Sequence, residues 1–128
     1  MFFRKSVKVP LYVGRFDIVI TDDKSAYEKV YNKFGRDEVF CHSSETSCKK
    51  SNYTHFVMVL NFNSNHKITH GIIAHEALHI TSFILDRVGQ EFDPNNHECF
   101  TYLIQWVTNE VYKLIYKKRQ IISVHFHI

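Results

Sequence analysis

The sequence predicts an α+β fold in a single domain over residues 1–128. The segment 53–62, YTHFVMVLNF, has a continuously apolar centre, which is typical of a strand covered on both faces. Two later segments, 69–88 and 94–117, carry apolar residues at the spacing of helices. A chain of 128 residues is large enough for one modest core and too small for two, and 45% hydrophobic residues indicate a folded chain.

The first part of the chain predicts strands and one short helix. Residues 9–20 are rich in β-branched and aromatic side chains, and Gly14 interrupts them, which predicts two short strands or one bent strand. A helix is predicted over 23–34, with an N-cap within 21–23 and Gly35 at its end.

The remaining short segments follow from local composition. A strand is predicted over 39–42, and the Ser- and Lys-rich segment 43–52 predicts an exposed loop. The alternating tail 121–128 predicts a final strand.

Composition limits the cellular setting and the partners. No apolar run approaches the roughly 18 residues of a membrane span, and the N-terminus lacks the apolar core of a secretory signal. We therefore expect a soluble protein that stays in the cytoplasm and has no membrane partner. Three cysteines argue against a disulfide framework. A net charge of +3 with only short basic runs does not predict a nucleic-acid partner.

The motif that carries chemistry is His75-Glu76-x-x-His79, within the helix predicted between the N-cap Thr69 and Gly89. Side chains four apart share one face of a helix, so both imidazoles can bind one Zn²⁺, and Glu76 lies beside it to act on a water. Apolar residues surround the motif, so we expect a buried helix whose polar groups need partners, which a metal supplies. The alternative is a structural pair of histidines.

A catalytic zinc site needs a third protein ligand and a water. His97 and Glu98 lie near the start of the second long helix, which we expect to begin at Pro94 with Asp93 as its N-cap. Glu98 is preferred because it neighbours the apolar line of that helix. His97 remains the alternative ligand, and a solvated Glu98 that interacts with the helix dipole is the alternative role.

Tyr102 lies one turn beyond Glu98. It could donate a hydrogen bond to the oxyanion of a hydrolytic intermediate, or it could bond to the ligand Glu98. A third possibility is an aromatic side chain of the core.

The pattern HEALH over 75–79, followed by Glu98, resembles the zincin metallopeptidases of the gluzincin branch, in which a downstream Glu completes the site. The runs VPLYVGRFDIVITDD, AHEALH and HECFTYLIQWV are also similar to small zincin-like proteins encoded by bacteriophages and their hosts. The resemblance implies a minimal zincin-like fold: a small twisted sheet, a metal-binding helix and a second long helix that brings Glu98. It also implies Zn²⁺ as cofactor, and a host cytoplasm or virion as location.

In zincins an edge strand near the metal helix pairs with an extended peptide substrate. The strand over 53–62 is one candidate for this edge, although its apolar centre favours a central place in the sheet. The strand over 39–42 is the other candidate.

The function predicted first is that of a zinc-dependent peptidase, in which Glu76 acts as general base on a metal-activated water and a peptide or protein is the substrate. The alternative is a zinc-binding structural or interaction protein without turnover, for instance a phage assembly or anti-host factor. The intact Glu76 favours the enzyme, and the small size of the chain favours the alternative. A nucleic-acid-associated zincin is the weakest reading.

Overall fold

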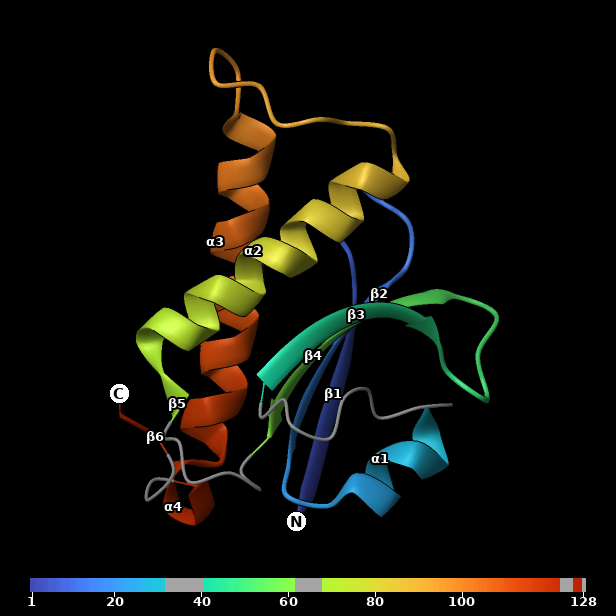
Figure 1. The fold of residues 1–128 in the computed structure, drawn as a ribbon, viewed down its shortest axis with the longest axis vertical. Coiled ribbons are helices and arrows are strands. Elements are labelled where there is room, and N and C mark those ends of the chain that lie inside the picture. Colours follow the sequence, from blue (N-terminus) through green and yellow to red (C-terminus); the bar gives the residue numbers. More distant parts are fainter. Residues whose placement is uncertain (32–40, 62–67, 123–125, 128) are drawn as a thin grey trace.

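The computed structural model describes residues 1–31, 41–61, 68–122 and 126–127, and its fold is α+β (Figure 1). Its centre is a four-stranded sheet in the order β1-β2-β4-β3. The four strands are β1 (Phe2–Lys8), β2 (Arg15–Thr21), β3 (Cys41–Ser47) and β4 (Thr54–Asn61). The outer strands β1 and β3 run antiparallel to their neighbours, and the two central strands run parallel to each other.

Helices cover both faces of this sheet. The long helices α2 (His70–Arg87) and α3 (Glu98–Lys117) pack on one face, and the short α1 (Lys24–Val30) lies on the other (Figure 1). The chain ends with α4 (Arg119–Ile122) and with β6 (Phe126–His127), which pairs in parallel with β5 (Ile68–Thr69). No helix among the described residues combines the length and the apolar character needed to cross a membrane.

The pleat of the central strands divides the interior into two clusters. Phe16, Ile18 and Ile20 of β2 join the cluster beneath α2 and α3. Val19 points the other way, into a smaller cluster with Tyr27 and Tyr31. The prediction of a central β4 is confirmed, because this strand is paired on both sides and buried from end to end except at Thr54.

The N-terminal strands differ from the prediction in position. Residues 2–8 form β1, which was not predicted, because Arg4, Lys5 and Ser6 break its apolar pattern. Much of the predicted strand 9–20 is instead the connection to β2. Gly14 sits in it at φ +94°, and a Cβ there would lie 2.8 Å from Cε2 of Phe56. Both the backbone conformation and the space therefore require glycine.

The prediction of a loop over 43–52 is wrong for its first five residues, which belong to β3. An edge strand with one covered face needs few apolar side chains, so its polar composition suggested a loop. The strand predicted over 39–42 is described only from Cys41 onward.

Two of the three predicted helix starts are correct. Asp23 Oδ1 accepts a hydrogen bond from Ala26 N at 3.1 Å and caps α1, and Thr69 Oγ1 accepts one from Ile72 N at 3.2 Å and caps α2. Gly89, at φ +73°, follows the end of α2 as expected. The predicted end of the first helix at Gly35 lies outside the described residues.

The third helix starts later than predicted. Asp93 Oδ1 accepts from Asn95 N at 2.9 Å and so organises a turn, and α3 begins at Glu98 with His97 at its N-cap position. In the tail, predicted as one strand over 121–128, α4 extends to Ile122 and only 126–127 are described as strand.

Candidate functional site

His75 and His79 lie side by side on the outer face of α2. Both residues are exposed, the Nε2 atoms of the two rings are 3.2 Å apart, and the ring centroids are 4.9 Å apart. The expectation that the helix is apolar and buried nearly all round is wrong, because Ala74 and Leu78 are exposed on the same side. Water can therefore solvate the imidazoles, and burial is no reason for them to need a metal.

The separation of the two nitrogens fits a metal ion. Zn–N bonds of about 2.0–2.1 Å at a tetrahedral angle place two imidazole nitrogens about 3.3 Å apart. The observed 3.2 Å between the Nε2 atoms of His75 and His79 agrees with this value. The same separation also permits one hydrogen bond between two neutral rings. The pair can thus fill two of the four positions around zinc.

Glu76 points around the helix from the histidines, towards the sheet. It is 6% exposed, and its carboxylate Oε1 accepts a hydrogen bond of 2.9 Å from the hydroxyl of Ser43 on the edge strand β3. An ion pair of 2.7 Å between Arg87 and Glu45 joins the far end of α2 to the same strand. The motif helix is therefore anchored along β3, and Ser43 fixes the direction of the Glu76 carboxylate.

A cavity of about 420 Å³ opens between the first half of α2 and the start of β3. His75 and Glu76 both line it, together with Cys41, Thr69, Gly71 and Ile72. The pKa of the Cys41 thiol is raised to about 12, chiefly by burial and to a smaller extent by the nearby Glu76, against a lowering hydrogen bond with the Asn61 backbone. Cys41 is therefore a neutral thiol at physiological pH. Among the described lining residues, Glu76 is the only acidic one.

The other predicted site residues lie at the start of α3. Glu98 and Tyr102 are both exposed, and 68% of Tyr102 is accessible, so the alternative of a core aromatic is wrong for Tyr102. His97 is also exposed, and its Nδ1 contacts the carbonyl oxygen of Pro94 at 3.1 Å. In the described parts of the chain, no group of three or more His, Cys, Asp or Glu side chains could hold a metal ion. The structure thus places the His75 and His79 rings side by side, with Glu76 on the adjoining, sheet-facing side of α2, and it does not bring Glu98 to them.

Ser43 is the site residue that sequence reasoning missed. It lay in a segment predicted as a loop, and a serine in a polar stretch carries no signal of its own. Only the pairing of β3 with the buried β4, which places Ser43 opposite Met58, brings its side chain to the same face of the sheet as α2.

Comparison with protein-family models, with curated proteins and with solved structures finds no significant match to this chain.

Proposed function

We propose that this chain is a zinc-dependent peptidase that hydrolyses peptide bonds in a peptide or protein substrate. The observation that carries the proposal is the 3.2 Å separation of the His75 and His79 Nε2 atoms, with Glu76 on the adjoining face of the same helix. Zn²⁺ held by this pair would lower the pKa of a bound water towards 7 and polarise the substrate carbonyl.

Glu76 is the general base in this proposal. Its side chain is buried, yet it lines the cavity beside His75, so a water or substrate in that cavity can reach its carboxylate. The Ser43 hydroxyl occupies one lone pair of Oε1 and holds the carboxylate in place. Glu76 would take the proton of the attacking water and deliver it to the leaving amine.

The edge of the sheet gives the substrate a place to bind. Among the described strands, β3 is paired only with β4, so its outer backbone groups can pair with an extended peptide. Ser43 of this strand donates to Glu76, which supports a substrate edge next to the proposed general base. This strand, and not the central β4, is therefore the edge that we assign to the substrate.

Glu98 remains our proposed third ligand, and Tyr102 the proposed donor to the oxyanion or to Glu98. Both side chains are exposed, and they belong to the first two turns of α3, whose course is shown in Figure 1. Since Glu98 is not grouped with the two histidines, zinc binding must draw the Glu98 side chain, or the first turn of α3, towards α2.

A non-catalytic zinc-binding structural or interaction protein is the second candidate. The observation that favours it is the lack of a three-ligand group among the described residues, because a two-histidine pair can bind metal without forming a hydrolytic centre.

Metal analysis and one substitution decide between the two candidates. The purified protein should carry about one Zn²⁺ per chain, and Glu76→Gln should keep the zinc and the fold while cleavage of a broad peptide library falls by about a hundredfold or more. Gln keeps the size of Glu and can still accept from Ser43, so the variant isolates the loss of the base. Zinc near zero after metal addition would refute the site, and equal cleavage by both proteins, or none by either, would favour the non-catalytic candidate.

A further inference from the structure

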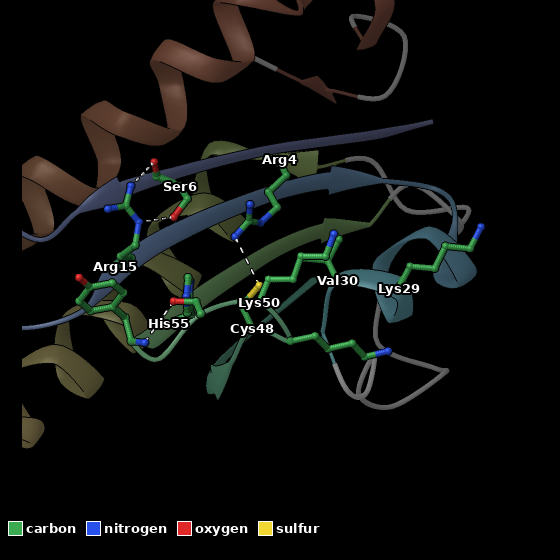
Figure 2. A pocket seen from close by; sticks show the side chains of 11 residues that line it. Arg4, Ser6, Arg15, Lys29, Val30, Cys48, Lys50 and His55 are labelled. Atoms are coloured by element: carbon green, nitrogen blue, oxygen red, sulfur yellow. Dashed lines mark hydrogen bonds between the residues drawn. The ribbon is translucent and has the colours of Figure 1, made fainter.

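A second cavity, of about 700 Å³, lies on the face of the sheet that carries α1 (Figure 2). Arg4, Arg15 and His55 form its floor, one each from β1, β2 and β4, and α1 and the turn between β3 and β4 form its walls. Helix α2, which carries His75 and His79, packs on the opposite face of these strands. A volume of 700 Å³ falls in the range of small-molecule sites.

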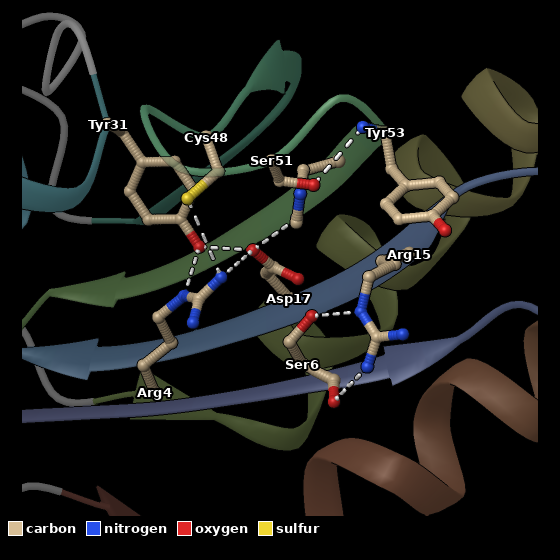
Figure 3. Close-up of polar contacts among 9 residues, drawn as sticks. Arg4, Ser6, Arg15, Asp17, Tyr31, Cys48, Ser51 and Tyr53 are labelled. Carbon is tan, nitrogen blue, oxygen red and sulfur yellow. Dashed lines mark hydrogen bonds and ion pairs between the residues drawn. The ribbon is translucent and has the colours of Figure 1, made fainter.

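The floor of this cavity is built on one buried carboxylate. Asp17 is fully buried, and its Oδ2 accepts hydrogen bonds from Arg4 Nη2 at 3.1 Å, from the Tyr31 hydroxyl and from His55 Nδ1 at 2.8 Å (Figure 3). A carboxylate buried in this way fixes the side chains that donate to it. Asp17 therefore positions Arg4 and His55 at the bottom of the cavity.

His55 leaves one ring nitrogen without a partner. Its side chain is 2% exposed, Nδ1 contacts Asp17, and among the described residues Nε2 has no hydrogen-bond partner although it is buried. A buried polar atom without a partner is unfavourable, and a bound ligand would satisfy it. In its neutral form Nε2 accepts from a ligand hydroxyl, and in its protonated form it donates to a phosphate oxygen.

The charged side chains that line the cavity are cationic, and the Asp17 carboxylate beneath its floor is paired with Arg4. The lining contains five cationic side chains and no Asp or Glu among the described residues: Arg4, Arg15, Lys29, Lys49 and Lys50. Two hydrogen bonds, of 2.8 and 3.0 Å, hold the Arg15 guanidinium on Ser6. Lys29 and Lys50 are exposed at the walls. A concave surface lined by cations attracts anions, and guanidinium groups held in place can donate two hydrogen bonds to phosphate oxygens.

We propose that this cavity binds a small phosphate ester of the nucleotide class. The phosphate would lie over Arg4 and His55, and the exposed Lys29 and Lys50 would add positive potential at the walls. Tyr53, 65% exposed, stands beside Arg15 at the rim and offers its ring for stacking on a planar base (Figure 3). The proposal does not depend on zinc or on the peptidase assignment.

The experiment is a titration of the full chain with adenosine 5′-monophosphate and, separately, with inorganic phosphate. Calorimetry would give the affinity, and ¹⁵N NMR of the histidine rings would report on His55 Nε2. Adenosine 5′-monophosphate should bind more tightly than inorganic phosphate and should shift the Nε2 resonance. The double variant Lys29→Ala/Lys50→Ala should weaken its binding tenfold or more. Lys117→Ala, which removes an exposed lysine of α3, should leave binding unchanged.

Each other result would overturn the proposal. Absence of saturable binding would do so, as would equal weakening by Lys117→Ala or an Nε2 resonance that does not move. Tighter and strongly salt-dependent binding of a single-stranded oligonucleotide would instead make the surface a site for nucleic-acid backbones. Glu76→Gln should bind adenosine 5′-monophosphate as tightly as the unmodified chain does. Failure of the zinc proposal can therefore be distinguished from failure of the phosphate proposal.

Discussion

Glu98 decides whether α3 takes part in the metal site. If it is the third ligand, Glu98→Ala should weaken zinc binding by more than the roughly 10- to 100-fold typical of losing an outer-shell partner. His97→Ala is the matched control, since among the described residues its ring contacts the Pro94 carbonyl and the side chain of Phe92. A competition titration with a chromophoric chelator measures both. A larger loss in His97→Ala would assign three histidines to the metal instead.

Cys41 allows a test of the buried side of the candidate site. Cys41 is 7% exposed, and burial raises the pKa of its thiol to about 12. Very little of it is therefore thiolate at pH 8. We expect iodoacetamide to label Cys41 far more slowly than the half-buried Cys99 in the folded chain. Mass spectrometry of the peptides measures both rates, and in urea the rates should converge. Equal labelling in the folded chain would contradict the packing of α2 on β3.

The sequence predicts the geometry of the candidate site only where its residues lie on the same helix. The spacing of His75 and His79 determines their shared face, and the structure places their Nε2 atoms 3.2 Å apart. Ser43, by contrast, meets Glu76 only through the pairing of β3 with β4. The sequence does carry a signal for the second cavity, because Asp17 and His55 each interrupt an apolar strand and so require polar partners.

The N-caps show which local sequence signals correctly predict where a helix begins. Thr69→Ala should lower the free energy of unfolding by about 1 kcal/mol, because Thr69 Oγ1 accepts from the Ile72 amide at the start of α2. Asp93→Ala should cost less, because the hydrogen bond that its side chain accepts among the described residues lies within a turn that precedes α3. Urea unfolding measures both variants. An equal or larger cost for Asp93→Ala would restore Asp93 as the helix cap that its sequence context predicts.

Strands were predicted correctly where both faces of the strand are buried, and incorrectly at the edges of the sheet. The apolar centre of β4 identifies it as a central strand, and the structure confirms this. The edge strands β1 and β3 carry charged or polar residues at many positions, so neither has the alternation of a half-buried strand. Edge strands are exposed along one side, and their sequences are therefore the least constrained by the core.

At the scale of the whole molecule, the sheet separates two chemical faces. One face carries α2 with the histidine pair, and the other carries the basic cavity above Asp17. This arrangement depends on the parallel pairing of β2 with β4, which sets Arg15 opposite His55. No local pattern gives that register, because the two strands are separated by α1 and β3 along the chain.

The cluster beneath α1 predicts how the stability of the chain depends on pH. Tyr27 and Tyr31 are almost fully buried, and burial raises the pKa of both phenols, that of Tyr27 to about 12. Since a phenol in the unfolded chain titrates near 10, the unfolded state loses these protons first. The stabilising effect is therefore complete below about pH 10 and is lost as the pH rises from 10 towards the pKa values of the folded state, by at most about 1.4 kcal/mol per pH unit for each group.

Urea midpoints at pH 8, 9.5 and 11 test this dependence, and Tyr27→Phe is the informative variant. Removing the hydroxyl costs the hydrogen bond to Ser44, so the variant should be less stable at pH 8. Between pH 10 and 11, however, its stability should fall less steeply than that of the unmodified chain, because one of the two buried phenols no longer titrates. Tyr102→Phe, at a side chain that is exposed in the folded chain, should keep the full slope. If all three proteins lose stability in parallel, the alkaline dependence comes from groups outside this cluster, and Tyr27 is more accessible to water than the structure places it.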